Sequence, residues 1–189
     1  FMTPECICKV DEFGNVIEAN EGFRPSSEIK MHMRVYQRRP DVGSVVHAHP
    51  SFATAFAIAG IPLTAPIMPE AVMFLGAVPI AEYGTPSTME IPDSLEKYLD
   101  YYDAVLLESH GALSWSADLM SAYHKMESLE FYAELMYKAH MLGGAKELDE
   151  EKIKKLYQVR GKYNMPGKHP ADVCLKKTAA DDNSIYKDL

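Results

Sequence analysis

The sequence has few cysteines, no long apolar run and no excess of positive charge, and each absence excludes a class of protein. Its three cysteines, Cys6, Cys8 and Cys174, are too few and too unevenly placed for a disulfide framework, which favours a reducing, cytoplasmic compartment. No apolar run approaches the roughly 20 residues of a membrane-spanning helix. The 27 acidic residues outnumber the 19 basic ones, giving a formal net charge of −8. This charge argues against nucleic acid and against a membrane surface as partners.

The chain also lacks internal repeats, a nucleotide-binding glycine loop, a nucleophile elbow and a cysteine-rich zinc ribbon. Its 189 residues are 47% hydrophobic and 24% charged, which is typical of one globular domain. We expect strands over 5–10, 16–19, 44–49, 78–82, 104–107 and 112–115, and helices over 25–39, 51–59, 94–101, 118–142 and 148–159. This alternation predicts an α/β fold, with a central sheet and helices on its faces. The polar stretch 166–189 lacks periodicity, so we expect the domain over 1–165 and a C-terminal extension or tail after it.

Two histidines, His47 and His49, stand two positions apart on the strand expected over 44–49. Because side chains alternate between the faces of a strand, both imidazoles point to the same face, with Cα atoms about 7 Å apart. Such a pair can converge on one metal ion, or it can be two polar residues at a strand end. His110 follows the strand expected over 104–107, and so also lies at a carboxyl end, where open α/β sheets bind ligands. Three neutral imidazoles with an open fourth position are typical of catalytic zinc.

A short polar motif, Pro25 followed by Ser26, Ser27 and Glu28, marks the beginning of a helix. A structural role explains it, because the serines can cap the helix and Glu28 favours the positive end of the helix dipole. The histidines open a functional alternative. Free N–H groups and two hydroxyls at a helix N-terminus suit a phosphate, and Glu28 would reach a metal-bound substrate as general base or acid.

Three motifs, taken together and in order, resemble the class II aldolase/adducin family, closest to L-fuculose-1-phosphate aldolase-like enzymes. The motifs are Pro25–Glu28, His47–Pro50 and Glu108–Ala112, and the resemblance covers about residues 3–145. It implies an α/β fold whose central sheet is mostly antiparallel, with helices on both faces. It also implies a homotetramer whose active sites lie at subunit interfaces.

The resemblance implies a role for each residue of the three motifs. In the family's aldolases, histidines that match His47, His49 and His110 bind a divalent metal, usually zinc, with manganese, cobalt or iron as alternatives. A glutamate that matches Glu28 accepts and donates the proton, and serines that match Ser26 and Ser27 hold the substrate phosphate. The implied activity is that of a metal-dependent lyase. It cleaves a ketose 1-phosphate into dihydroxyacetone phosphate and a small aldehyde, with the metal as Lewis acid.

The chain departs from the family pattern at two places. The family domain begins earlier, with a Gly-Asn segment that binds phosphate, and nothing in this sequence matches that segment. The aldolases also carry a tyrosine after the short apolar helix, which serves as proton donor in the neighbouring subunit's site. The corresponding stretch 65–71 contains no tyrosine. Glu70 is a candidate substitute or an ordinary loop carboxylate, and Tyr157 and Tyr163 are further candidates.

The sequence alone leaves several alternative functions. Epimerases of the same superfamily carry an aspartate where Glu28 stands, whereas its sugar-phosphate dehydratases also carry a glutamate, and decarboxylases belong to the same group. A non-enzymatic, adducin-like interaction module is an alternative of another class. Adducin heads, however, lack the full set of metal ligands, and this chain keeps all three histidines. The third alternative is a metal-free binding protein in which all these residues are structural.

Overall fold

The structure is a computed structural model, and it describes residues 2–172. Residues 173–189, which include Cys174 and most of the expected C-terminal extension, lie outside the described residues. The helices and strands are, in chain order, η1 (Pro4–Cys6), β1 (Lys9–Val10), β2 (Val16–Glu18), α1 (Ile29–Arg38), β3 (Ser44–Ala48), α2 (Ser51–Ala59), η2 (Ala71–Leu75), β4 (Ile80–Ala81), α3 (Glu90–Leu95), β5 (Ala104–Leu107), β6 (Gly111–Ser116), α4 (Leu119–Met141) and α5 (Glu150–Lys162). Among the described residues, no helix is both long enough and apolar enough to cross a bilayer.

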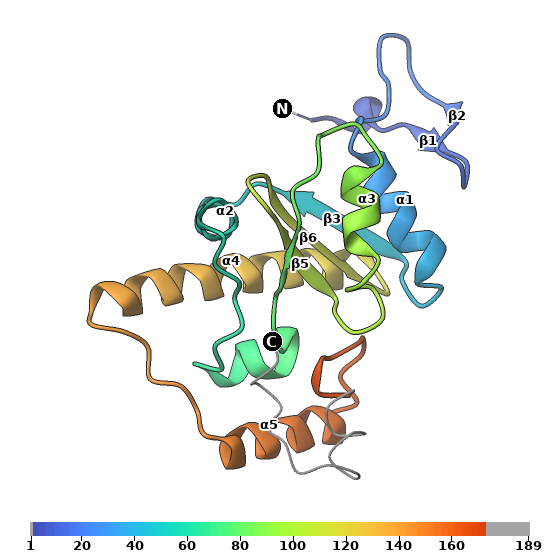
Figure 1. Cartoon of the computed structure of the whole chain (residues 1–189). Helices are drawn as coiled ribbons and strands as arrows, with labels where there is room; N and C mark the ends of the chain where they lie inside the picture. Colours follow the sequence, from blue (N-terminus) through green and yellow to red (C-terminus); the bar gives the residue numbers. More distant parts are fainter. Residues whose placement is uncertain (1, 173–189) are drawn as a thin grey trace.

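The central sheet has four strands in the order β3-β6-β5-β4. Strand β6 pairs antiparallel with β3 on one side and with β5 on the other, and only the short β4 runs parallel to its neighbour β5. Strands β1 and β2 form a separate antiparallel hairpin, at the upper right of Figure 1. The prediction of a mostly antiparallel central sheet is therefore confirmed.

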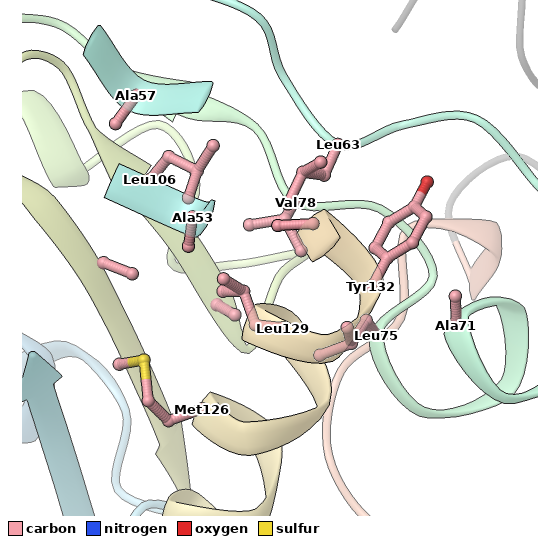
Figure 2. Close-up of a cluster of buried hydrophobic side chains, with 13 residues drawn as sticks. Ala53, Ala57, Leu63, Ala71, Leu75, Val78, Leu106, Met126, Leu129 and Tyr132 are labelled. Carbon is pink, nitrogen blue, oxygen red and sulfur yellow. The ribbon is translucent and has the colours of Figure 1, made fainter. Parts of the chain in front are cut away.

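Helices cover both faces of the sheet, as predicted (Figure 1). Side chains of β5 alternate between the faces: Leu106 packs in one apolar cluster with Ala53 of α2 and Leu129 of α4. Val105 packs in a second cluster, with residues of α1 and α3. Figure 2 shows the first cluster, in which side chains of α2 and α4 meet the sheet. Because both faces are buried, β5 and β6 have no exposed residue, which explains the uninterrupted apolar sequence of β5.

The helix boundaries follow local signals, with one clear exception. Asp118 and Asp149 cap α4 and α5, since each carboxylate accepts a backbone N–H three residues later. The prediction of a helix over 94–101 is wrong, because α3 spans Glu90–Leu95 and turns follow it. Its start is fixed by Thr88, whose Oγ1 accepts the N–H of Glu90 at 3.1 Å. Pro92 lies in the first turn, where a missing N–H breaks no helical hydrogen bond.

The segment after α5 packs against η2 and α5. His169 is buried, and its Nε2 lies 2.7 Å from the carbonyl oxygen of Val72, to which it donates. The Arg160 guanidinium donates to the carbonyl oxygens of Met73, Pro166 and Gly167. These contacts connect residues 166–172 to the body of the domain, although composition alone set this stretch apart as a possible tail.

A buried charge cluster lies at the start of β5, centred on Asp103. The Asp103 carboxylate accepts Nη2 of Arg39 at 2.8 Å and Nζ of Lys125 through its other oxygen. All three residues are buried. Burial lowers the pKa of Lys125, against the opposing effect of the Asp103 charge. Buried charges are tolerated only when they are paired in this way.

Replacing Asp103 with Asn should therefore destabilise the domain strongly. Lys125 would remain buried without a counter-charge, so we expect a loss of about 3 kcal/mol or more in the free energy of unfolding. Asp100→Asn is the matched control, since Asp100 is 61% exposed and lies 3.8 Å from Arg38; it should lose less than about 1 kcal/mol. Urea denaturation of both variants measures the difference, and equal losses would contradict the structural role of Asp103.

Candidate active site

Three histidines from two strand ends meet at one edge of the sheet. His47 belongs to β3, His49 follows it directly, and His110 lies in the turn between β5 and β6. The ring centroids form an almost equilateral triangle with sides of 4.8, 4.9 and 4.9 Å. One ligand nitrogen from each ring lies within 4.8 Å of the others. The three expected ligands are thus in one cluster.

The neutral tautomer of His47 is set by its backbone partner. Its Nδ1 lies 2.9 Å from the carbonyl oxygen of Ala112, and a carbonyl only accepts, so Nδ1 carries the proton and Nε2 keeps its lone pair. Most metal-binding histidines are oriented in this way, by a hydrogen bond from the ring nitrogen that does not bind the metal. Burial lowers the pKa of His47 to about 4. The ring is therefore neutral near pH 7, as a metal ligand must be.

The donor set fits a divalent cation. Nε2 of His47 lies 3.0 Å from Nε2 of His49, close to the roughly 3.3 Å between nitrogens that share a tetrahedral zinc ion. Nδ1 of His110 is buried and has no hydrogen-bond partner among the described residues, a condition that proteins rarely leave unexplained. Among residues 2–172 this cluster consists of the three histidines, and three imidazoles leave a coordination position for a substrate oxygen.

Glu28 faces this cluster from the beginning of α1. Its Oε2 lies 3.8 Å from Nε2 of His110, and its side chain is 18% exposed. Burial lowers the pKa of His110, while the Glu28 charge acts in the opposite direction. The structure therefore brings together the carboxylate and the histidines, which sequence spacing alone left apart.

The two serines do not cap α1 as expected. Glu28 itself is the N-cap residue, in a helical backbone conformation, and its side chain makes no capping hydrogen bond. Its carboxylate is consequently available to the histidines. Ser26 is exposed, and its Oγ accepts the N–H of Glu28 at 3.2 Å. Ser27 is also exposed, so both serines are accessible to solvent immediately before Glu28.

The turn that carries His110 is strained. Ser109 has a φ of 56°, a left-handed conformation that non-glycine residues adopt rarely and mostly at functional sites. Its N–H donates to the carbonyl oxygen of Ala57 in α2 at 3.2 Å. Glu108 accepts the N–H of Tyr83 at 2.8 Å. These contacts fix the position of the turn and thereby the orientation of the His110 imidazole.

Gly111 lies against the second ligand. A Cβ at this position would meet Cδ2 of His49 at 2.6 Å and the carbonyl oxygen of Ala48 at 2.7 Å. Only glycine leaves space for the His49 ring beside the β3–β6 ladder. The sequence places a glycine directly after His110, but the reason for it becomes visible only when the two strands are paired.

Tyr157 and Tyr163, the candidate proton donors, make their contacts outside the histidine cluster of their own chain. The Tyr157 hydroxyl donates to Asp172, and its ring packs against His169, with centroids 5.4 Å apart. Tyr163 is exposed at the end of α5. Glu70 is exposed at the N-cap of η2.

Comparison with known families agrees with this geometry. Residues 1–137 match the family described as Class II Aldolase and Adducin N-terminal domain. The chain belongs to the class II aldolase and adducin family. An L-fuculose phosphate aldolase of Methanococcus maripaludis is 32% identical over 137 residues, which are 72% of this chain and 72% of that protein.

Relatives within the family have different named reactions. A 3-oxo-tetronate 4-phosphate decarboxylase of Pectobacterium atrosepticum is 32% identical over 140 residues, which are 72% of this chain and 63% of that protein. A solved structure named L-fuculose 1-phosphate aldolase superposes with a TM-score of 0.74 at 31% identity, covering 83% of this chain and 73% of that one. The family and the fold are thus shown, whereas the substrate of this member is not fixed by similarity.

Replacing Gly111 with Ala should weaken the metal site. The new methyl group would push the His49 ring away from its two partners, and we expect the affinity for Co²⁺ to fall by about tenfold or more. Gly161→Ala is the control, because nothing lies within 4 Å of its Cβ position in α5. Titration with Co²⁺, followed by its visible absorption, measures both variants. Equal affinities for the two would contradict the close approach of Gly111 and His49.

Proposed function

We propose that this protein is a metal-dependent aldolase that cleaves a ketose 1-phosphate similar to L-fuculose 1-phosphate. The products would be dihydroxyacetone phosphate and a small aldehyde. The observation that carries the proposal is the cluster of three imidazoles with the Glu28 carboxylate 3.8 Å from His110. A neutral donor set and an adjacent proton-transfer group are the two parts that this chemistry needs.

In this proposal His47, His49 and His110 hold the cation, with zinc favoured over manganese, cobalt or iron because three histidines with an open fourth position are typical of catalytic zinc. When bound, a divalent cation supplies Lewis-acid polarisation of the substrate carbonyl. Glu28 transfers the proton: it protonates the carbon that loses its bond to the aldehyde fragment, and removes that proton in the direction of condensation. The half-buried setting of Glu28 limits competition from water at this step.

The beginning of α1 has groups that suit the substrate phosphate. Ser26 and Ser27 expose their hydroxyls immediately before this helix, and the positive end of a helix dipole attracts phosphate. We therefore propose these two serines as phosphate contacts. We also propose a cytoplasmic location for the protein. Cys6 and Cys8 are free thiols, as is usual in a reducing compartment.

We also propose that the enzyme works as a homotetramer with its sites at subunit interfaces. Large apolar side chains are exposed along α2 and α4, among them Ile58, Tyr123, Phe131 and Tyr137. Exposed apolar surface of this kind often marks an interface. A neighbouring subunit would also supply the proton donor for the aldehyde oxygen, and Glu70 is our candidate for that role because its side chain is exposed.

A decarboxylase is the second candidate function, because a relative with that name is 32% identical to the chain, the same identity as that of the aldolase of Methanococcus maripaludis. Both reactions break a carbon–carbon bond next to a carbonyl, so the same cation and carboxylate would serve either. A panel of ketose 1-phosphates, followed by release of dihydroxyacetone phosphate, and of 3-oxo acid phosphates, followed by release of carbon dioxide, separates the two candidates.

Replacing Glu28 with Gln should abolish most turnover without loss of metal. The amide cannot carry the proton, so we expect kcat to fall by more than about 100-fold. Elemental analysis should find the metal content unchanged. Glu21→Gln is the control, because Glu21 is an exposed carboxylate of the preceding segment. Near-wild-type turnover of the Glu28 variant would overturn its proton-transfer role.

Replacing His49 with Ala should remove the metal itself. Two imidazoles bind a divalent cation much more weakly than three, so we expect both metal content and turnover to be lost together. His124→Ala is the matched control, since His124 is an exposed histidine paired with Glu127 on α4. Full metal occupancy in the His49 variant would contradict the assignment of this ligand.

A further inference from the structure

Helix α2 begins immediately after the histidine pair and has no cap of its own. Its N-cap residue is Pro50, which offers no side-chain oxygen. The first N–H groups of a helix have no partner within the helix and need an acceptor from elsewhere. A serine or aspartate usually supplies it at the N-cap, but here that position follows directly on the metal-ligand motif.

A carboxylate from a distant helix takes this role. Glu130 of α4 accepts the N–H of Phe52 through Oε1 at 2.9 Å and the N–H of Ala53 through Oε2 at 2.8 Å. Both oxygens are engaged, and the negative charge lies at the positive end of the α2 dipole. Charge-assisted hydrogen bonds of this kind are the stronger and more directional ones.

Helix α2 connects the two histidine-bearing strand ends. At its beginning, Pro50 is bonded directly to His49. Near its end, the Ala57 carbonyl oxygen accepts the N–H of Ser109 at 3.2 Å, one residue before His110. A displacement of α2 would therefore move two of the three imidazoles.

Apolar contacts hold α2 against the sheet and α4. Ala53 and Ala57 are fully buried, and Figure 2 shows them beside the sheet and α4. Phe52 and Phe56 pack against the same cluster, and the Phe52 ring lies beside that of Tyr137 in α4, with centroids 5.7 Å apart. The hydrophobic effect is non-directional, whereas the two hydrogen bonds to Glu130 are directional and add a restraint on the position of the first turn of α2.

We propose that Glu130 is a positioning residue for the histidine cluster. Its carboxylate fixes the beginning of α2, and α2 in turn fixes His49 through Pro50 and His110 through Ser109. This inference deepens the proposed function and rests on it for its catalytic meaning. The mechanical part, from Glu130 to the Ser109 turn, does not depend on any bound metal.

The test compares Glu130→Gln with Glu134→Gln in the full-length protein. Glutamine keeps the size of Glu130 but turns one acceptor into a donor that faces a backbone N–H. Glu134 lies one turn further along α4, and its carboxylate pairs with the exposed Lys138 of the same helix. Glu130→Asp keeps the carboxylate and should restore part of the effect.

Two readouts are measured on each variant. In metal-free protein, we expect amide hydrogen exchange of Glu130→Gln to accelerate by about tenfold in peptides covering 51–57 and 108–111, and to be unchanged in α1. With Co²⁺, we expect the affinity to fall by about 10- to 100-fold, with an altered visible absorption spectrum. Glu134→Gln should match the wild type in both.

The outcomes separate the two proposals. Unchanged exchange at 108–111 in the Glu130→Gln protein would overturn the positioning role, whatever the metal does. Accelerated exchange with unchanged Co²⁺ affinity and spectrum would also overturn the positioning role, because the metal site would then be insensitive to the position of α2. If the wild-type protein takes up no Co²⁺, the proposed function fails, and the exchange data still decide whether Glu130 controls the Ser109 turn.

Discussion

The register of β6 between its two neighbours is the constraint on which the site depends. Ala48 pairs with Ala112 on one side of β6, and Leu107 pairs with Gly111 on the other. The end of β3 and the β5–β6 turn therefore meet at one edge, and His49 and His110 with them. A slip of one residue would turn the side chains of a strand to the opposite face. Gly111 protects this arrangement, because any larger residue would collide with the His49 ring.

The candidate site and the buried charge cluster around Asp103 lie at opposite ends of β5. At one end, the three histidines and the half-buried Glu28 form the candidate site, and Ser109 holds a left-handed conformation. At the other end, Asp103 neutralises buried cations, and the packed core lies between. Strain and unpaired polar atoms at an active site are sustained by well-packed structure elsewhere. The separation explains why a stability defect at Asp103 and a chemical defect at Glu28 should be independent.

Local patterns in the sequence were sufficient for most elements and for the histidine pair. Alternation along a strand placed His47 and His49 on one face, and a glycine correctly ended α2. The contribution of long-range pairing was not visible in the sequence, because no local signal says that β6 lies between β3 and β5. The place of His110 at a strand end suggested a shared site, but it could not show that the two strand ends are neighbours. The same holds for Glu28, whose backbone conformation frees its carboxylate, and for Glu130, which reaches α2 across 77 residues of sequence. The prediction of a helix over 94–101 was wrong, because Thr88 and Pro92 favour an earlier helix start than the spacing of the apolar residues suggests.

The central claim is that three imidazoles hold a catalytic cation, and metal content tests it most directly. The protein should be purified without chelators and without a nickel column, and then measured by elemental analysis. We predict about one zinc, manganese, cobalt or iron ion per chain, or uptake of one when zinc is added to metal-free protein. A protein that contains no metal and takes up none on addition of zinc would contradict it.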